Sequence, residues 1–507
     1  MNFSYLSLIR NRMNKIFTDK SLMWFNLYLF VLYILVVIEN SVSDSSANNI
    51  LTIIIPVFFI DSIKTIIESL TPKRLIKSVE DLSKVNVVIP CHNGGDFLGK
   101  TLKSLLKKFP AKSIIVSSNG STDNTVEVAK SYGVRVLDIK EGVGKVEAIN
   151  RALELVKVPY TLIMDDDVIL GNAIVPTNIL DEGYEAAAFR VLPIKENYLT
   201  ELQTHEYRKS MDIGRMFHNS TGTVQNVSGA IGLFYTDELI RQTKIHSGEF
   251  SGEDLQRTLL IHLTEMKKGV VIVDSTVKTE VPSNIKVLFT QRVLGWNPGF
   301  YANFLNYLKL VFTMRDIPWR LRYEAFYNTF LLTLLDPIRV GGLVLLIRNP
   351  EYLAVTYVIY FICELVTWLI MGRKEAVWVV FIFPFYGMFN LITRTLALIV
   401  FFYRRLVVLI NSSKYKDEYK NVNLAIKFAS WQLTNIFSVA FVFASISATE
   451  FVNTRKFPEI EMENQKVVSS VSIYDQKILD RLVNKSFNIK SAKTSNMLGI
   501  FYYDLLK

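Results

Sequence analysis

The sequence predicts an α/β domain inserted between apolar helical hairpins. Two observations support this fold class. Half of the 507 residues are hydrophobic, and several apolar runs approach the length that spans the hydrocarbon core of a bilayer. Residues 80–286 contain no run of that length and instead alternate short β-branched strands with amphipathic helices. The chain is therefore expected to combine a membrane part with a globular part.

The charge of the chain narrows the kinds of molecule that it is expected to bind, and its cysteine content bears on disulfides and metal sites. The chain has 57 Lys and Arg against 47 Asp and Glu, a formal net charge of +10. No zinc-finger spacing or base-reading motif accompanies this charge, so we expect anionic lipid and a phosphorylated substrate and no nucleic acid. The two cysteines, Cys91 and Cys363, lie far apart, which predicts neither a disulfide framework nor a cysteine-ligated metal.

Two apolar runs, 22–38 and 50–70, predict a transmembrane hairpin within residues 1–79. Lys and Arg flank the hairpin on both sides and are absent from its link, so the positive-inside rule places both flanks in the cytoplasm. Within the second run, Asp61 and Lys64 share a helix face. We expect them to neutralise each other, with a polar path as the alternative.

Residues 323–447 are expected to form a C-terminal membrane region. The runs 323–347 and 352–371 predict a second hairpin, and the run 424–447 predicts a last crossing. Residues 448–507 read as a polar appendage. Together these runs predict a multi-pass protein of the cell membrane whose α/β domain is cytoplasmic.

The run 377–402 is harder to place because Pro384, Gly387 and Arg394 interrupt it and further cations follow it. A single crossing would leave those cations outside, against the positive-inside rule. We therefore expect a bent segment that enters the membrane and returns, with a full crossing as the alternative.

The α/β domain begins with an apolar strand at 85–89, a turn, and a helix whose leucines share one face. A second strand, in "SIIVSSNGSTDNT", ends in another polar turn that leads into a helix. Repeated strand–turn–helix units form half of a nucleotide-binding sheet, whose ligand lies at the carboxyl ends of the strands. Asp123 in the second turn is the candidate nucleotide contact, and an Asx turn is the alternative.

Three carboxylates, Asp165, Asp166 and Asp167, directly follow an apolar strand at 160–164. Like charges at the end of a buried strand cost free energy unless a cation accompanies them. Side chains alternate along an extended segment, so Asp165 and Asp167 can point at one ion while Asp166 faces elsewhere. Mg²⁺ or Mn²⁺ would bridge such a pair to a diphosphate. A solvated acidic loop is the alternative.

A series of motifs resembles one family. "VIPCHN", "NGSTD", "GVGKVEAIN" and "MDDDV" resemble, in order and spacing, the inverting family 2 glycosyltransferases of GT-A fold. The later "VSGAIG", "SGEDLQRTL" and "QRVLGW" look like the membrane-integrated processive branch, which contains hyaluronan, chitin and cellulose synthases. The resemblance covers about residues 85–402. It implies a UDP-sugar donor, a divalent metal bound by Asp165 and Asp167, and donor binding by Asp165 through that metal.

The resemblance also assigns roles to other residues. The family's general base is the Asp of the "SGED" motif, which is Asp254 here, with Glu253 as the second choice and a helix-start carboxylate as the alternative. Lys145 in "GVGK" is the candidate contact of the diphosphate or of an acidic neighbour, and a solvated lysine at a helix start is the alternative. Ser228 and Gly229 in "VSGAIG" look like the segment that lines the acceptor sugar, and a simple glycine turn is the alternative.

Two departures from the family pattern bear on recognition of the donor. The acidic pair that the family has before "GS" is Ser118 and Asn119 here. When "QRVLGW" is aligned on Trp296, the family's arginine falls on Gly295, so Arg292 becomes the candidate diphosphate contact. Trp296 still offers an aromatic face for the acceptor's terminal sugar, and an interfacial Trp is the alternative.

Residues 287–322 interleave aromatic and basic side chains in the manner of helices that lie in the membrane interface. In the family that this sequence resembles, such helices form the floor of the active site, which opens onto a transmembrane channel. This arrangement suits an enzyme that extends a chain while passing it outward.

These features predict a processive synthase that transfers sugar from a UDP donor to a growing β-linked polysaccharide and secretes it. By analogy with single-enzyme capsule synthases of Gram-positive bacteria, UDP-glucose and a capsular β-glucan are favoured. A hyaluronan synthase with two donors, a non-processive transferase acting on polyprenyl phosphate and a non-enzymatic membrane protein are the alternatives. The sequence carries no signal of oligomeric state.

Overall fold

The computed structural model describes residues 47–71, 76–246, 252–263, 268–303, 319–330, 335–347 and 349–410. All of them belong to one of the two compact units of the chain, Met1–Thr434. The expected crossings at 22–38 and 424–447 and the expected tail at 448–507 lie outside the described residues.

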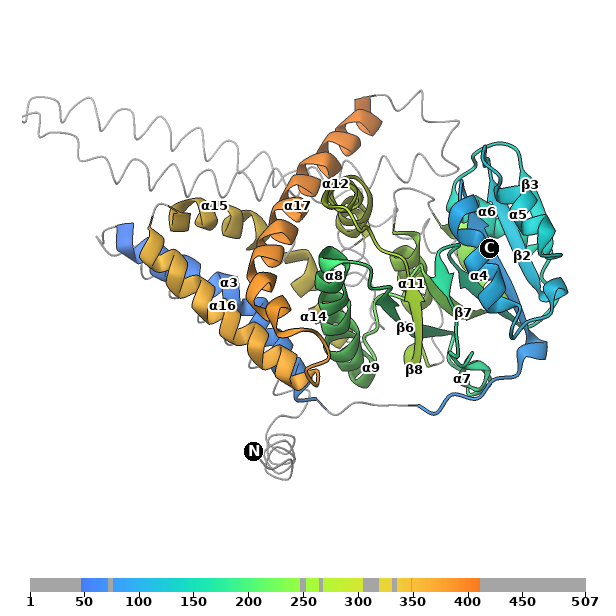
Figure 1. Ribbon diagram of the computed structural model, residues 1–507, viewed down its shortest axis with the longest axis horizontal. Coiled ribbons are helices and arrows are strands. Elements are labelled where there is room, and N and C mark those ends of the chain that lie inside the picture. Colours follow the sequence, from blue (N-terminus) through green and yellow to red (C-terminus); the bar gives the residue numbers. More distant parts are fainter. Residues whose placement is uncertain are drawn as a thin grey trace, which may run out of the picture. The chain divides into compact units, whose positions relative to one another are not determined.

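Eight strands form one mixed sheet in the α/β domain (Figure 1). They are β1 (Val85–Cys91), β2 (Ile114–Asn119), β3 (Arg135–Ile139), β4 (Tyr160–Met164), β5 (Val168–Ile169), β6 (Ala186–Pro193), β7 (Ile231–Tyr235) and β8 (Val270–Thr279). The strand order is β3-β2-β1-β4-β7-β6-β8-β5. Strands β3, β2, β1 and β4 are parallel, and β7 runs antiparallel to β4 and β6. The predicted α/β fold class is confirmed.

Helices cover the sheet and continue beyond it. Those of the α/β domain are η1 (Leu82–Lys84), α4 (Gly95–Leu105), η2 (Ala111–Ser113), α5 (Thr125–Ser131), α6 (Lys145–Leu153), α7 (Thr177–Asp181), α8 (Tyr198–Arg208), η3 (Lys209–Arg215), α9 (Met216–Thr221), α10 (Thr236–Ile245) and α11 (Glu253–Leu263). The others are α3 (Ala47–Ser69), α12 (Ile285–Thr290), η4 (Gln291–Trp296), α14 (Trp319–Phe330), α15 (Asp336–Ile347), α16 (Pro350–Ile370) and α17 (Val377–Ile410).

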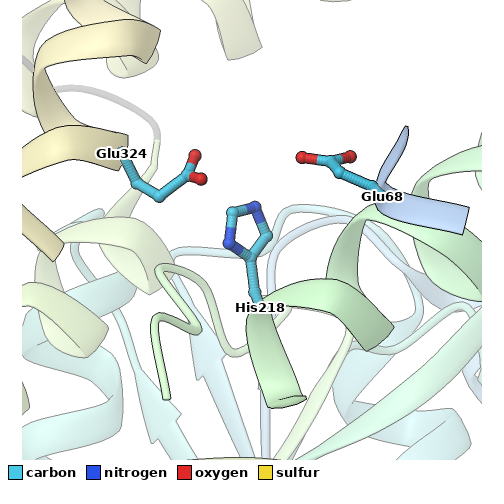
Figure 2. A group of neighbouring side chains, drawn as sticks. All are labelled: Glu68, His218 and Glu324. Atoms are coloured by element: carbon cyan, nitrogen blue, oxygen red, sulfur yellow. The ribbon is translucent and has the colours of Figure 1, made fainter. Parts of the chain in front are cut away.

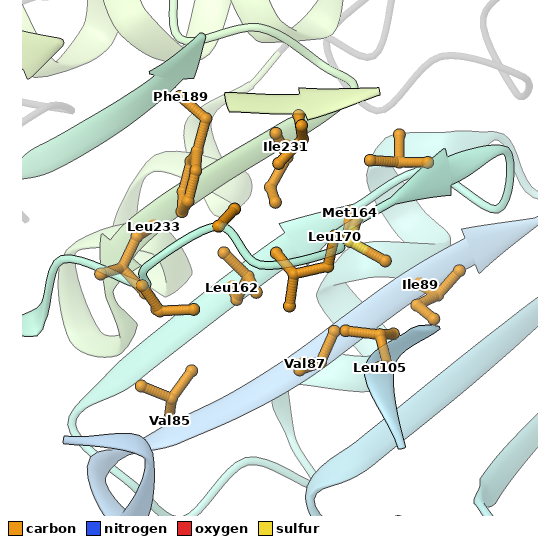
Figure 3. Close-up of a cluster of buried hydrophobic side chains, with 14 of the residues drawn as sticks. Val85, Val87, Ile89, Leu105, Leu162, Met164, Leu170, Phe189, Ile231 and Leu233 are labelled. Carbon is orange, nitrogen blue, oxygen red and sulfur yellow. The ribbon is translucent and has the colours of Figure 1, made fainter. Parts of the chain in front are cut away.

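Alternating side chains of the central strands build a separate hydrophobic core on each face of the sheet. On one face, Val85, Val87 and Ile89 of β1 pack against leucines of α4 and against side chains of β4 and β7 (Figure 3). On the other face, Val88 packs with Ile149 of α6. Full burial of such a side chain stabilises the fold by about 1.5–3 kcal/mol. The two cores therefore hold the strand ends in fixed positions.

Strand β4 lies between β1 and β7, and all five of its residues are buried. The structure confirms the predicted strand at 160–164. Directly after it, the backbone N–H of Asp165 donates to the carbonyl of Ala230 over 2.9 Å. The turn that precedes β7 is thereby attached to the backbone of Asp165, the first residue of the acidic triplet.

Among the described residues, two helices are long and apolar enough to cross a membrane, Pro350–Ile370 and the Val377–Arg404 part of α17. The prediction that 377–402 bends back is wrong, because α17 is one continuous helix of 34 residues. Pro384 lies inside that helix, where it removes one backbone hydrogen bond without ending it. Gly387 serves close packing, since a Cβ there would lie 2.9 Å from the Tyr360 hydroxyl.

Charged side chains of the helical region are paired between helices. Arg339 of α15 donates to Asp61 of α3 over 2.7 Å and to Asp336 over 3.1 Å. Arg394 of α17 donates to Asp336 over 2.6 Å. Three helices are therefore joined by one network of two arginines and two aspartates.

The predicted pairing of Asp61 with Lys64 is wrong. Asp61 binds Arg339 instead, and Lys64 donates to Glu68 and lies 3.5 Å from Glu324 of α14. Neighbouring helices supply Arg339 and Glu324, which the spacing within α3 does not reveal, whereas Glu68 is four residues after Lys64 on α3 itself.

Gly232 of β7 generates a first prediction. A Cβ at this position would lie 2.4 Å from Val227 Cγ1 and 2.8 Å from the Phe234 ring. We expect Gly232→Ala to destabilise the fold by about 1–3 kcal/mol through overpacking, measured as a lower thermal unfolding midpoint. Gly142→Ala is the control, because Gly142 is exposed and a Cβ there meets nothing within 4 Å. Equal midpoints for the two variants would contradict the packing argument.

Candidate active site

Four ionisable side chains meet where one strand ends and two helices begin. Lys145 is the first residue of α6, Asp165 follows β4, and Glu253 and Asp254 open α11. Lys145 Nζ lies 2.8 Å from Asp165 Oδ1 and 2.6 Å from Glu253 Oε1. One ammonium group therefore links two of the predicted site carboxylates.

The turn before β7 brings the predicted acceptor segment to the same place. The backbone N–H of Gly229 donates to Asp254 Oδ2 over 2.8 Å. A Cβ on Gly229 would lie 3.4 Å from both Asp254 Oδ2 and Glu253 Oε1. Ser228 precedes this contact, and its carbonyl accepts from the backbone N–H of Ile231 over 3.2 Å. Ser228 and Gly229 thus border the carboxylates in a tight turn.

The three carboxylates of the acidic triplet point in different directions. Asp166 Oδ2 accepts from the thiol of Cys91 over 2.7 Å, so this side chain turns toward β1. Asp165 instead contacts Lys145, and Asp167 Oδ1 accepts from the Thr279 hydroxyl over 3.2 Å. The segment was expected to be extended, but the chain turns at Asp166 and Asp167, where the backbone N–H of Val168 donates to the carbonyl of Asp165 over 3.4 Å, and this turn separates the side chains.

The carboxylates differ in how readily they ionise. Burial raises the pKa of Asp165 to about 7, although the charge of Lys145 opposes the shift. Burial and a neighbouring carboxylate raise the pKa of Asp167 to about 6. Burial and the charge of Glu253 also raise the pKa of Asp254. At Glu253 the effect of burial is outweighed by the Lys145 ammonium, so its pKa is lowered. The pKa of Glu253 is therefore lowered, whereas the pKa values of the other three carboxyls are raised.

Asp165 and Asp167 fit a hard divalent cation. They offer carboxylate oxygens, the ligands that Mg²⁺ and Mn²⁺ prefer. Their raised pKa values reflect a shortage of positive charge that such an ion would supply. Lys145 supplies part of this charge at Asp165, so an ion bound there would compete with the ammonium group for the same oxygen.

Asp123 organises the loop between β2 and α5. Its carboxylate accepts from the backbone N–H of Gly95 over 3.0 Å and of Thr125 over 3.1 Å, and also from the Thr125 hydroxyl. Against the effect of burial, these hydrogen bonds lower the pKa of Asp123. Such contacts belong to the Asx turn that was the alternative interpretation, and contact of Asp123 with a nucleotide stays a prediction.

Arg292 and Trp296 belong to a separate network on η4. Arg292 Nη2 donates to Glu206 Oε2 over 2.8 Å, and its guanidinium carbon lies 4.5 Å from the Trp296 ring centroid. Tyr386 of α17 donates to the same Glu206 oxygen over 2.7 Å. Arg292 therefore orients Trp296 and joins η4 to α17. Its contact with a diphosphate stays a prediction, as does sugar stacking on Trp296.

Two arginines near the carboxylates, of which Arg257 is buried and Arg215 is half-buried, were missed by the sequence analysis. Arg257 lies one turn after Glu253 on α11, is 3% exposed, and has its guanidinium carbon 5.7 Å from the Phe234 ring centroid. Arg215 is the last residue of η3 and acts electrostatically on Asp254. The four-residue spacing from Glu253 to Arg257 was a usable signal. No sequence pattern indicated Arg215, because its proximity to Asp254 arises from tertiary packing.

Comparison with known families and curated proteins gives partial matches. Residues 86–172 match the model described as Glycosyl transferase family 2. The chain is 24% identical over 246 residues to poly-β-1,6-N-acetyl-D-glucosamine synthase of Staphylococcus epidermidis, which covers 44% of this chain and 57% of that protein. It is 25% identical over 167 residues to the protein of that name from Staphylococcus aureus, covering 31% and 40%. The chain thus spans about half the length of these relatives.

Solved structures show more distant likenesses. A mannosyltransferase of Pyrobaculum calidifontis in complex with GDP-Man and Mn²⁺ has a TM-score of 0.46 at 12% identity, covering 68% of this chain and 94% of that one. Staphylococcus aureus TarS 1-349 in complex with UDP-GlcNAc has a TM-score of 0.36 at 14% identity, covering 62% and 90%.

The raised pKa of Asp165 predicts a pH-dependent effect of Asp165→Asn in protein kept free of divalent metal. The carboxyl of the folded chain titrates near pH 7 instead of near 3.8, so the folded state holds its proton more tightly than the unfolded state. Ionisation therefore costs the wild type stability as the pH rises from about 4 to about 7. We expect the thermal midpoint of Asp165→Asn, relative to wild type, to increase by several degrees over this interval.

The control for this comparison is Asp96→Asn, which removes an exposed carboxylate from the start of α4. Its midpoint relative to wild type is expected to stay constant with pH. A constant difference for Asp165→Asn as well would contradict the burial of this carboxyl.

Proposed function

We propose that this chain is an inverting, metal-dependent glycosyltransferase that polymerises sugar from a UDP-sugar into a β-linked polysaccharide. The observation that most strongly supports this proposal is that the Lys145 ammonium bridges Asp165 and Glu253, with Asp254 next to Glu253 in the chain. The match of residues 86–172 to Glycosyl transferase family 2 supports sugar transfer. The names of the staphylococcal relatives support polymer synthesis.

On the donor side, Asp165 and Asp167 would hold Mg²⁺ or Mn²⁺ against the diphosphate. When bound, the ion stabilises the negative charge that develops on departing UDP. Lys145 already lies among anions and would exchange a carboxylate for a diphosphate oxygen without leaving the site. Asp123 at the neighbouring strand end and Arg292 on η4 are the further candidate donor contacts.

On the acceptor side, Asp254 would act as the general base. The acceptor hydroxyl forms a new bond to the anomeric carbon, the bond from that carbon to UDP breaks, and the hydroxyl proton passes to Asp254. The raised pKa of Asp254 brings the proton affinity of this carboxylate closer to that required at neutral pH. Ser228 and Gly229 would border the acceptor sugar, because Gly229 leaves room beside the base.

The donor sugar has two candidates. The sequence favoured UDP-glucose and a capsular β-glucan by analogy alone. The names of the matched relatives instead support UDP-N-acetylglucosamine. We favour the second donor because it rests on an alignment of 246 residues.

The proposed location is the cell membrane, with residues 80–286 as a cytoplasmic catalytic domain. Helix α16 and most of α17 are long and apolar enough to cross a bilayer. The proposed multi-pass arrangement would place residues 287–322 at the interface and pass the polysaccharide through residues 323–447. Trp296 would stack on the terminal sugar at the entrance.

Asp254→Asn tests the proposed base. We expect the purified wild type, incubated with Mn²⁺ and radiolabelled UDP-N-acetylglucosamine or UDP-glucose, to form high polymer from one of them without an added lipid acceptor. The variant should lose about 10²–10⁴-fold in rate and retain UDP binding, because the amide cannot accept the proton.

Asp237→Asn is the matched control. Asp237 is an exposed acid in the second position of α10, as Asp254 is in the second position of α11. Polymer synthesis by Asp254→Asn at the wild-type rate would refute the assignment of the base. A product of single sugars on an added polyprenyl phosphate would refute polymerisation.

Metal dependence can be tested within the acidic triplet itself. We expect EDTA to stop transfer and added Mn²⁺ or Mg²⁺ to restore it. Asp167→Asn should raise the Mn²⁺ concentration for half-maximal rate at least about tenfold, because one charged ligand is lost. Asp166→Asn should change it little, because Asp166 faces Cys91. The same metal requirement for both variants would contradict the proposed ligand pair.

A further inference from the structure

A second group of candidate metal ligands lies outside the candidate active site. Glu68 of α3, His218 of α9 and Glu324 of α14 point toward one another from three helices, as Figure 2 shows. One ligand atom from each lies within 4.8 Å of the other two. Glu68 is 6% exposed and Glu324 is 3% exposed, so water screens neither carboxylate effectively.

Hydrogen bonds engage one ring nitrogen of His218. His218 Nδ1 lies 2.9 Å from the Thr223 hydroxyl, which lies 2.8 Å from the Thr221 hydroxyl. The Thr221 hydroxyl reaches the carbonyls of Phe217 and His218 over 3.0 Å and 3.3 Å. A chain of donors from Nδ1 to these carbonyls would place the proton on Nδ1 and leave the lone pair on Nε2. The ring edge with Nε2 is turned toward the two carboxylates (Figure 2).

Two buried carboxylates share one ammonium group at this junction. Within the described part of the chain, the ammonium of Lys64 donates to Glu68 and lies 3.5 Å from Glu324 Oε2. That oxygen is buried and makes no hydrogen bond to any described residue. Arg215 also acts electrostatically on His218. A buried carboxylate oxygen without a hydrogen bond favours a further cation beside it.

We propose that Glu68, His218 and Glu324 bind a first-row divalent metal ion, Zn²⁺ in the first instance, which ties α3 and α14 to α9. An imidazole nitrogen and carboxylate oxygens at about 2.0–2.2 Å are the ligands that Zn²⁺ takes. A hydrogen bond from Nδ1 to a hydroxyl is the outer contact that orients a metal-binding histidine. This site is independent of the proposed sugar transfer.

Lys64 is the competitor for this site. Ligands of one Zn²⁺ lie about 3.3 Å apart, so the ligand atoms, which lie within 4.8 Å of one another, must draw closer by up to about 1.5 Å and the ammonium must move away. Two rings offer it a position, because Lys64 Nζ already lies 4.9 Å from the Tyr327 ring centroid and 5.7 Å from that of Phe217. Lys64 therefore lowers the affinity for Zn²⁺ without supplying a ligand.

The test uses the full chain with Asp165→Asn and Asp167→Asn, which removes the candidate catalytic ion. Equilibrium dialysis against Zn²⁺ is expected to give one bound Zn²⁺ per chain and a thermal midpoint that rises with Zn²⁺ concentration. Adding His218→Gln should lower the affinity at least about tenfold and abolish the rise of the midpoint. His92→Gln is the matched control, because His92 is exposed.

Lys64→Met tests the proposal through an expected gain in Zn²⁺ affinity, whereas His218→Gln tests it through a loss. Removing the competing ammonium is expected to raise the Zn²⁺ affinity about tenfold or more, so a gain is measured and no loss of folding can imitate it. Unchanged affinity in both His218→Gln and Lys64→Met would overturn the proposal and identify the cluster as an ion-pair network only. Binding that persists at full strength in His218→Gln alone would also overturn it, since the ion would then lie elsewhere.

Discussion

The ammonium group of Lys145 is the interaction on which the candidate active site depends. It lies within hydrogen-bond distance of Asp165 at the end of β4 and of Glu253 at the start of α11. Without it, two partly buried carboxylates would face each other at a cost that burial increases. The backbone completes the arrangement, because the turn that binds the Asp165 amide through Ala230 also binds the Asp254 carboxylate through Gly229. Electrostatics and backbone hydrogen bonds thus position the same acids.

A second set of buried charges joins the α/β domain to the apolar helices. His205 of α8 is fully buried between Glu364 and Glu375, and Lys209 and Arg208 bind the same two carboxylates. The attraction within such pairs offsets little more than the free-energy cost of desolvating their charges, but the pairs permit few alternative packings. They hold the start of η3, a π-helical segment of the kind that often occurs at functional sites. The chain then continues through α9 to the turn at Gly229.

The sequence was informative where a local pattern decides the structure. The strand Tyr160–Met164 was predicted with its bounds, because five apolar residues end at three charges. The approach of Lys145 to Glu253 could not be predicted, because it depends on how α6 and α11 pack on the sheet. Asp61 and Lys64 were paired wrongly, because Asp61 binds Arg339 of another helix, whereas Lys64 donates to Glu68 of the same helix and lies near Glu324 of α14. In α17, Pro384 and Gly387 were read as breaks, whereas the glycine serves helix packing.

The length of α17 has a consequence for how the molecule would respond to its surroundings. At 1.5 Å per residue its 34 residues extend about 51 Å, against a hydrocarbon thickness of about 30 Å. In the proposed membrane arrangement, a helix of this length would lean or protrude, and the balance would shift with the acyl chains around it. Its side chains Tyr386 and Arg404 contact Glu206 of α8 and the carbonyl of Leu294 of η4. A tilt of α17 in that arrangement would therefore act on the contacts that join α8 and η4 to it.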